Sequence, residues 1–253
     1  MKKQVLFIHG AGGYEEDKKL AADLRDGLGT AYDVRCPKMP DDSAVAVWKD
    51  QIVRELAALD GEVILVGHSL GGSILLKYLV EEEVKKPVAG VFLIAPPYWG
   101  TEDWEVDEYV LDEDFASKLP TELPVFFYHS RNDEVVPFAH LALYAEKLPQ
   151  AIIREFDDRG HQFDNDLSEV GRDIRSCNGG FVETPESNLP VELSKPARRA
   201  LIAADYWQLE QLTEIRASEI EQLHGVGPKT LYQLRNALDA NGLSFAGEKN
   251  KEV

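Results

Sequence analysis

Six short apolar runs, separated by amphipathic stretches, constrain the fold of the first 177 residues more than any other feature of this sequence. Most of the runs are continuously apolar, which is typical of strands buried on both faces of a parallel sheet. Strand and helix patterns that alternate in this way predict a three-layer α/β fold. The expected strands cover residues 4–9, 32–36, 62–67, 88–95, 124–129 and 151–156.

Helical patterns fill the gaps between these runs. They cover residues 15–28, 43–59, 69–82, 138–148 and 162–175. The segment 96–120 breaks the rhythm, because it is rich in carboxylates, tryptophan and tyrosine and has no clear period. Two interpretations stay open: a solvated surface insertion, or a loop or small cap whose aromatic side chains line a site.

The charge balance bears on the class of ligand rather than on the fold. The formal net charge of -18 repels phosphate backbones and anionic membranes, which disfavours a general nucleic-acid or membrane-surface role. The two cysteines, Cys36 and Cys177, provide neither a metal-binding spacing nor a disulfide framework. Since no signal-peptide core and no run long enough for a membrane span are found, we expect a soluble, cytoplasmic protein with reduced thiols.

The stretch VGHSLGGS, residues 66–73, follows the third apolar run and opens a helical pattern. Within it, Gly67 to Gly71 matches G-x-S-x-G, in which the serine sits on a strained turn from strand to helix and the glycines remove side chains that would clash. The N-terminus of the following helix favours a developing anion at that serine. We therefore predict that Ser69 is a nucleophile rather than part of a glycine-packed turn.

A serine hydroxyl needs a base, and the chain contains six histidines. His161 is the predicted base, because it lies in a loop after the last expected strand, at the edge where open α/β folds bind ligands. His68 neighbours the serine on the turn and would point elsewhere. His9 is expected to shape its own loop rather than to transfer protons.

The orienting acid should follow another strand and lie between the serine and the histidine in the chain. Asp133 meets both conditions, since it follows the strand expected at 124–129. Its nearest competitor is Glu134, one position along the chain. The predicted order is therefore Ser69, Asp133, His161, which is the order of the α/β-hydrolase architecture.

Backbone N–H groups must stabilise the oxyanion that forms when the serine attacks a carbonyl. One donor is expected from Leu70, directly after the nucleophile. The other is expected from the glycine-rich loop after the first strand, where the backbone can approach the substrate closely. Ala11 is the first choice there and Gly12 the second. Neither a metal nor an organic cofactor is needed for this chemistry.

Four motifs, FIHGAGG, VGHSLGG, SRNDEVVPF and RGHQF, stand in this order along the chain. In sequence and spacing they resemble the small α/β-hydrolases of the retinoblastoma-binding-protein-nine type, over about residues 3–175. The resemblance implies an α/β-hydrolase core with little cap and serine-esterase chemistry. It implies no particular substrate.

The composition changes after Cys177, where residues 178–193 have the glycines, prolines and asparagines of a linker. We therefore expect a hydrolase domain over 1–177 and an all-helical domain over 194–253. The second domain resembles the helix-hairpin-helix domain at the C-terminus of the bacterial RNA polymerase alpha subunit, in LSKPARRAL, LHGVGPK and LDANGLSF. In DNA-binding relatives the hairpin N–H groups and basic neighbours contact phosphates. The residues here that could contact DNA or a partner are Gly225, Gly227 and Lys229, with Arg198, Arg199 and Arg235 as further basic candidates.

Two classes of function stay open. The first is a serine hydrolase that cleaves small esters or related acyl compounds through an acyl-enzyme, or an acyltransferase that uses the same site. The second is a binding module whose C-terminal domain recruits DNA or a protein. The mild negative charge of that domain disfavours DNA, since strong phosphate binding needs several uncompensated cations.

Overall fold

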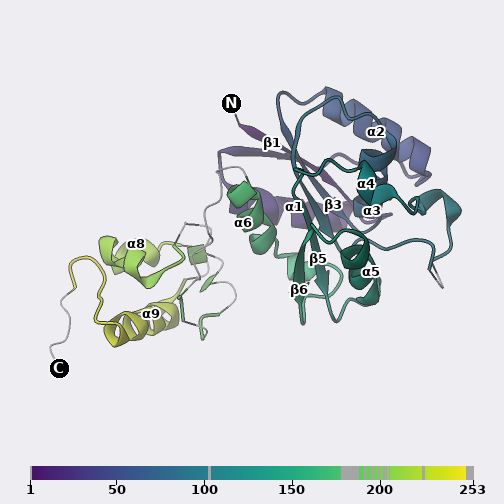
Figure 1. Ribbon diagram of the computed structural model, residues 1–253. Helices are drawn as coiled ribbons and strands as arrows, with labels where there is room; N and C mark the ends of the chain where they lie inside the picture. The colour runs from purple at the N-terminus through teal and green to yellow at the C-terminus, as the bar shows by residue number, and fades with distance from the viewer. Residues whose placement is uncertain are drawn as a thin grey trace. The chain divides into compact units, whose positions relative to one another are not determined.

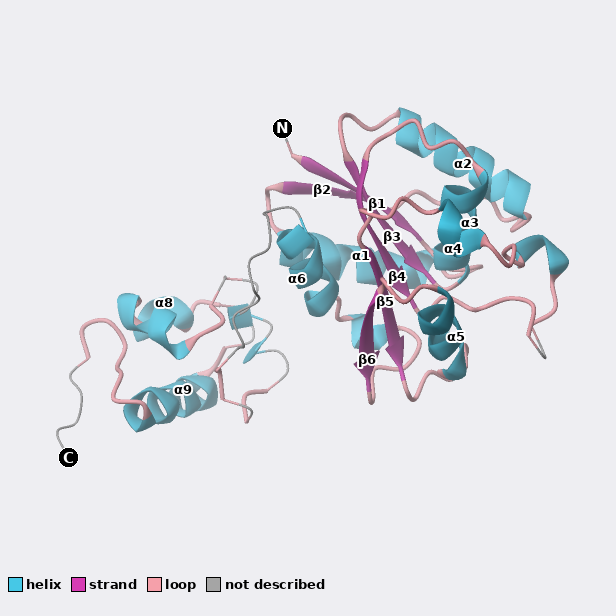
Figure 2. Ribbon diagram, viewed as in Figure 1, coloured by secondary structure: helices cyan, strands magenta, loops and turns pink. Residues whose placement is uncertain are grey.

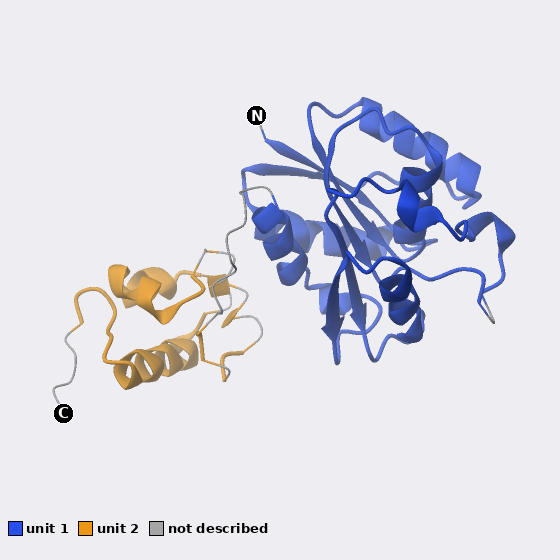
Figure 3. Ribbon diagram, viewed as in Figure 1, with its two compact units in different colours: residues 1–178 blue, residues 179–253 orange. Residues whose placement is uncertain are grey.

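The computed structural model describes residues 2–101, 104–177, 188–190, 192–194, 197, 198, 200, 201, 204, 206–223 and 226–248. The chain divides into two compact units, residues 1–178 and 179–253, and each is described by itself (Figure 3). Most of the predicted linker lies outside the described residues.

The first unit is built on a six-stranded parallel sheet with the strand order β2-β1-β3-β4-β5-β6 (Figure 1). The strands are β1 (Lys3–Ile8), β2 (Tyr32–Arg35), β3 (Val63–His68), β4 (Val88–Ile94), β5 (Val125–Ser130) and β6 (Ile152–Phe156). The three-layer α/β prediction is confirmed. One detail differs: β6 is an edge strand that is largely open to solvent, so its apolar run does not reflect burial on both faces.

Helices cover both faces of the sheet (Figure 2). One face carries α1 (Tyr14–Leu28) and α6 (Ser168–Cys177), and the other carries α2 (Val45–Ala57), α3 (Leu70–Glu81), α4 (Phe115–Lys118) and α5 (Ala139–Lys147). Neighbouring strand residues point into opposite layers, because side chains alternate along a strand. Leu6 and Ile8 thus lie in one core cluster and Val5 and Phe7 in the other.

The helix predicted at 162–175 begins later than expected. The chain first makes the short helical turn η2 (Phe163–Asn165), and all three of its residues have positive φ angles of 50–53°. This turn buries Phe163, whose ring packs against Phe156 at 5.4 Å between centroids. The first part of the predicted helix is therefore a turn that carries the chain onto the α1 side of the sheet.

The segment 96–120 keeps many exposed side chains but is anchored to the rest of the first unit. It contains η1 (Asp107–Tyr109) and α4, and it is anchored on the start of α2 by two hydrogen bonds. Glu108 Oε2 accepts from the Val45 N–H at 3.0 Å, and the Tyr109 hydroxyl donates to the Ser43 carbonyl at 3.0 Å. The aromatic side chains of this segment are consequently fixed against the first unit.

The second unit is helical, with η3 (Leu209–Glu214), α8 (Ala217–Ile220) and α9 (Pro228–Ala240). Its core is a separate apolar cluster that includes Leu212, Leu234, Leu238 and Phe245. α9 begins with Pro228 in its first turn, directly after Gly227. In the part of the chain that the structure describes, no helix is long and apolar enough to cross a membrane.

The close packing of α3 on β1 generates a stability prediction. A Cβ at Gly71 would overlap the carbonyl oxygens of Ile8 and His9, whereas a Cβ at Gly27, inside α1, would meet nothing within 4 Å. We expect Gly71→Ala to lower the free energy of unfolding by about 3 kcal/mol, because backbone must move. Gly27→Ala should raise it by about 0.5 kcal/mol. Urea unfolding of both variants measures the difference, and equal stabilities would contradict this packing.

Candidate active site

Five loops meet at the carboxyl edge of the sheet, because the carboxyl ends of parallel strands all lie at one edge. They follow β1, β3, β4, β5 and β6. In open α/β folds this edge is where ligands bind. Every residue that the sequence assigned to catalysis lies in one of these loops or at the start of α3.

Ser69 joins β3 to α3 in a strained conformation, with φ 51° and ψ -127°. Its N–H donates to the Ile94 carbonyl at 2.8 Å, and its carbonyl accepts from the Gly72 N–H at 2.9 Å. A Cβ added at Gly67 would lie 2.6 Å from the Gly72 Cα, so glycine is required for the turn to close. This is the geometry that the G-x-S-x-G pattern predicts.

His161 and Asp133 are brought together by the loops after β6 and β5. His161 Nδ1 lies 2.8 Å from Asp133 Oδ2 and 3.1 Å from Oδ1. His161 and Ser69 line the same pocket. An imidazole whose Nδ1–H is held by a carboxylate presents its Nε2 as a base.

The Asp133 side chain is fully buried and surrounded by donors. Its Oδ1 accepts from the N–H groups of Val135 and Val136, both at 2.8 Å, and His129 Nε2 lies 3.3 Å from Oδ2. Burial opposes the charge, but the hydrogen bonds from His129 and His161 hold the pKa of Asp133 well below its ordinary value. Asp133 is therefore ionised at neutral pH.

Glu134, the competing acid, is placed differently. Its Oε2 lies 3.2 Å from the backbone nitrogen of His161 and accepts that N–H. Two further residues that the sequence did not single out join the same loops. Asn132 Oδ1 accepts from the Gly160 N–H at 2.8 Å, and Ser130 Oγ accepts from the Arg159 N–H at 2.8 Å. These contacts fix the His161 loop on the end of β5.

The loop after β1 lies against the nucleophile. A Cβ at Gly10 would lie 3.1 Å from the Ser69 Cβ, so this loop could not carry a side chain there without displacement. The Gly10 N–H is already engaged by Asp17. Ala11 and Leu70 both line the pocket, whereas Gly12 is not among the lining residues. The geometry thus favours Ala11 over Gly12 as the donor that accompanies Leu70.

His9 is occupied within its own loop. The Met39 N–H donates to Nε2 at 2.9 Å, so the ring proton resides on Nδ1, which lies 2.6 Å from the Gly10 carbonyl oxygen. Burial lowers the pKa of His9, which agrees with a neutral ring. This arrangement supports the interpretation that His9 shapes the loop.

The pocket at this edge has a volume of about 430 Å³. Ser69 and His161 line it together with the aromatic residues Trp99, Trp104 and Tyr109. These rings pack on one another, with Trp99 4.6 Å from Tyr109 and 5.0 Å from Trp104 between centroids. Of the two interpretations of segment 96–120, the structure favours the loop that lines a site.

The sequence did not indicate that Asp17 and His68 contact each other. Asp17, in the first turn of α1, is fully buried and lies 2.8 Å from Nδ1 of His68. The other ring nitrogen of His68 lies 3.0 Å from the His161 carbonyl oxygen. A signal for Asp17 existed, because it shares the 3.6-residue stripe of Leu20, Ala21 and Leu24, which predicts burial.

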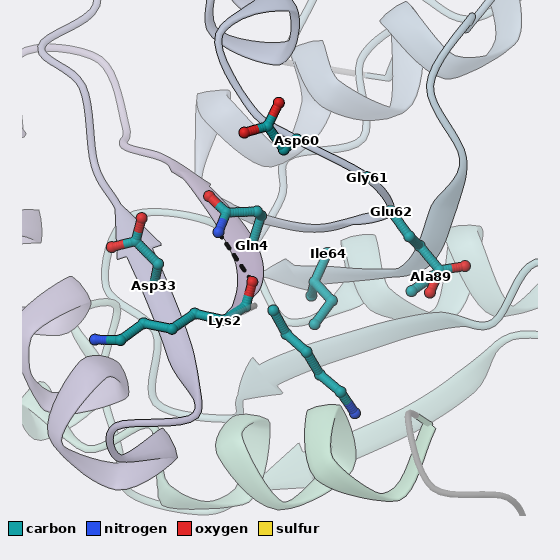
Figure 4. Close-up of a pocket in the computed structure, with 9 residues that line it drawn as sticks. Lys2, Gln4, Asp33, Asp60, Gly61, Glu62, Ile64 and Ala89 are labelled. Atoms are coloured by element: carbon teal, nitrogen blue, oxygen red, sulfur yellow. Dashed lines mark hydrogen bonds between the residues drawn. The ribbon is translucent and has the colours of Figure 1, made fainter.

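A second pocket, of about 440 Å³, lies at the opposite edge of the sheet (Figure 4). It is lined by residues at the amino ends of β1 and β3 and by their neighbours, including Gln4, Asp60 and Ile64. None of its lining residues is a serine, cysteine or histidine. It therefore does not provide a nucleophile and a base.

Metal binding has no support in the described part of the chain, where no group of three or more histidine, cysteine or carboxylate side chains could hold an ion. Cys36 and Cys177 are free thiols. Burial raises the pKa of Cys36 to about 12 and that of Cys177 to about 11, so neither is a reactive thiolate.

The possible contact residues of the C-terminal unit are partly visible. Lys229 is exposed in the first turn of α9, after Gly227, whereas Gly225 and Arg199 lie outside the described residues. The Arg235 guanidinium pairs with Glu248 at 2.8 Å. The guanidinium of Arg198 donates to the Pro190 carbonyl at 2.7 Å. These two arginines therefore make these contacts within the unit.

Comparison with known proteins agrees with this fold. A family model described as serine hydrolase matches residues 5–166. No curated protein matches the chain. The ydeN gene product from B. subtilis is 20% identical and covers 71% of this chain and 100% of its own, with a TM-score of 0.54.

Two further solved structures are similar. Est1E from Butyrivibrio proteoclasticus is 17% identical and covers 69% of this chain and 86% of its own, with a TM-score of 0.54. Arabidopsis thaliana SOBER1 is 16% identical and covers 70% of this chain and 100% of its own, with a TM-score of 0.55. At such identities the likeness concerns the fold, which is that of the α/β-hydrolases.

The buried charge of Asp133 predicts a dependence of stability on acid. Because the folded pKa lies below the unfolded value of about 3.9, the stabilisation is present above that pH and is lost as the pH falls through the folded pKa. Asp133→Asn should lower the free energy of unfolding by about 2 kcal/mol at pH 7, and the difference from wild type should shrink below about pH 4. Urea titrations over this pH range measure it. A difference that grows towards acid would contradict the assignment.

The engaged arginines of the C-terminal unit predict weak or no binding to duplex DNA. In a gel-shift assay at low salt, we expect duplex DNA to keep its free mobility in the presence of the full chain and of a chain ending at Cys177. A shift that requires the C-terminal unit and that disappears with added salt would restore the DNA hypothesis. Lys229→Ala would then show whether the exposed start of α9 contributes.

Proposed function

The chain belongs to the serine hydrolase family, and we propose that it cleaves small, uncharged esters or related acyl compounds with Ser69 as the nucleophile. The observation that carries the proposal is the His161–Asp133 contact of 2.8 Å in the loops that border the Ser69 pocket. The motifs that resemble the retinoblastoma-binding-protein-nine type contain all three residues. The reaction requires no metal or organic cofactor, and the place we propose for it is the cytoplasm.

Acylation begins when the Ser69 hydroxyl attacks the carbonyl carbon of the substrate. His161 Nε2 takes the hydroxyl proton as the Oγ–C bond forms, and Asp133 stabilises the resulting imidazolium through Nδ1. The N–H groups of Leu70 and Ala11 donate to the oxyanion. The intermediate then collapses, the bond to the leaving oxygen breaks, and His161 gives its proton to the departing alcohol.

Deacylation repeats these steps with water. His161 takes a proton from the water as its oxygen attacks the acyl carbon, and a second oxyanion forms in the same place. The bond between the acyl carbon and Ser69 Oγ breaks, and Oγ recovers the proton from His161. The acid leaves, and the enzyme returns to its starting state.

The pocket favours uncharged acyl groups of modest size. Its volume of about 430 Å³ lies near the lower end of ordinary small-molecule sites. No lysine or arginine is among its described lining residues, while Glu16 is, and His68 is paired with Asp17, so a carboxylate or phosphate on the substrate would find no unpaired cation. The aromatic residues Trp99, Trp104 and Tyr109 suit an aromatic or short aliphatic acyl group.

For the C-terminal unit we propose the helix-hairpin-helix fold that its motifs resemble. Its function is contact with a protein rather than with DNA, because Arg198 and Arg235 are engaged within the unit. Hydrolysis itself is assigned to the first unit alone.

The nucleophile is tested by labelling. Wild-type protein should react with a fluorophosphonate probe and turn over p-nitrophenyl acetate, and Ser69→Ala should lose both, because no other residue takes the place of the attacking oxygen. Cys36→Ala is the matched control and should keep both activities. A wild type that cannot be distinguished from Ser69→Ala in the two assays would sink the proposal.

The base and the orienting acid are tested by kinetics. We expect His161→Ala to reduce kcat by about 10⁶-fold, since it removes the base, and Asp133→Asn by about 10⁴-fold, since it leaves the imidazole in the wrong tautomer. Glu134→Gln should cost far less, because Glu134 accepts only a backbone N–H of the loop. If Glu134→Gln were the more damaging of the two acid variants, the roles of the two carboxylates would be reversed.

A further inference from the structure

Asp17 connects three segments that surround the nucleophile. Its carboxylate accepts from the Gly10 N–H at 2.7 Å, from His68 Nδ1 at 2.8 Å and from Gln162 Nε2 at 3.1 Å. These donors belong to the loop after β1, the end of β3 and the loop after β6. One fully buried carboxylate therefore joins the oxyanion loop, the nucleophile turn and the loop of the base.

His68 carries a proton on both ring nitrogens in this arrangement. Nδ1 faces a carboxylate, and Nε2 lies 3.0 Å from the His161 carbonyl oxygen. Both partners are acceptors only, so both nitrogens must donate and the ring is an imidazolium. Burial opposes this charge, but the hydrogen bond and the charge of Asp17 raise the pKa of His68 above its ordinary value.

Charged and titratable groups face His68 from several elements. Asp17 comes from α1, and the His161 ring lies 4.7 Å away between centroids. Asp133, after β5, stabilises the charge of His68, and His9, after β1, interacts with it. Among the described residues, Asp17 is the only carboxylate that accepts a hydrogen bond from His68, so it is the counter-ion of this ring.

Packing alone does not explain the ion pair, because burying two charges has a large desolvation cost. The two side chains are 0% and 2% exposed, and charges taken out of water at such depth lose most of their hydration. Apolar side chains of the same volume would stabilise the fold at least as well. The pair instead fixes the positions of the catalytic loops, because its other hydrogen bonds each join it to one atom of such a loop.

We propose that Asp17 and His68 are positioning residues, a buried ion pair that holds the oxyanion loop and the His161 loop in place around Ser69. This role rests on the proposed function. His161 is then fixed at two points: its ring by Asp133 and its carbonyl by His68. The Gly10 carbonyl is held by His9 and its N–H by Asp17, which fixes the peptide that carries the Ala11 N–H.

Kinetics of Asp17→Asn and His68→Gln test the role in the full chain. A displacement of a reacting group by about 1 Å can cost about 10²-fold in rate, so we expect each variant to lose about that factor in kcat for p-nitrophenyl acetate, with little change in KM. The rate of fluorophosphonate labelling should fall in parallel. The double variant should lose about as much as either single variant, because both act through one network.

Asp173→Asn is the matched control. Asp173 is also buried and bonded to three groups, the Tyr128 hydroxyl at 2.8 Å and two nitrogens of Arg154 at 3.0 Å, but it lies on α6 and lines no part of the pocket. The Asp173→Asn variant should be less stable than the wild type and keep the wild-type kcat. If Asp17→Asn and His68→Gln lose no more activity than Asp173→Asn, the positioning role is wrong.

A spectroscopic readout tests the ion pair itself. In long-range ¹H–¹⁵N spectra of the wild type at pH 7, one histidine should show two protonated ring nitrogens, and its signals should be absent from His68→Gln. In Asp17→Asn that ring should become neutral. A neutral His68 ring in the wild type would overturn the proposal. Should Asp17→Asn not fold, the wild-type spectrum and the kinetics of His68→Gln decide.

The two levels of the account fail differently. A wild type no more reactive than Ser69→Ala removes the proposed function and the positioning role together. A reactive wild type, combined with unaffected Asp17→Asn and His68→Gln variants, removes the positioning role alone.

Discussion

The strained backbone at Ser69 is the constraint on which the rest of this site depends. A non-glycine residue at φ 51° and ψ -127° costs on the order of 1–3 kcal/mol and persists only where its surroundings over-determine it. Here the Ile94 carbonyl takes the Ser69 N–H, and α3 approaches β1 so closely that only glycine fits at position 71. The turn places the hydroxyl at the carboxyl edge, and the other four loops are arranged around it.

Two buried aspartates stabilise that arrangement. Asp133 accepts from the His161 ring, and Asp17 acts on the same loop through His68 and Gln162. Both carboxylates stay ionised because hydrogen bonds compensate for the water they lose. The loops of an active site are ordinarily its least ordered parts, and here each is tied to a strand end or a helix start by charge-assisted hydrogen bonds.

Much of the fold was readable from the sequence because buried parallel strands leave a simple signal. Each strand was placed to within one residue, and the order of Ser69, Asp133 and His161 along three loops followed from the topology. The start of α6 was missed because the apolar spacing at 163–167 arises from a left-handed turn that buries Phe163, which a helical period imitates.

The Asp17–His68 pair was missed for a different reason. Asp17 follows Glu15 and Glu16 at a helix start, where acidic residues are ordinarily explained by the helix dipole. Its partner His68 lies 51 positions away along the chain, at the end of β3, and sequence spacing carries no information on such a contact. The partners of Arg198 and Arg235 are likewise set by the tertiary fold, and contact of the C-terminal unit with DNA stays a prediction to be tested.

A crystal structure of the fluorophosphonate adduct tests the central claim most directly. The account predicts phosphorus bonded to Ser69 Oγ and the phosphonyl oxygen about 2.7–3.1 Å from the backbone nitrogens of Leu70 and Ala11. His161 should still be held by Asp133 and by its carbonyl contact with His68. Phosphorus on any residue other than Ser69, or a phosphonyl oxygen that faces away from both N–H groups, would contradict it.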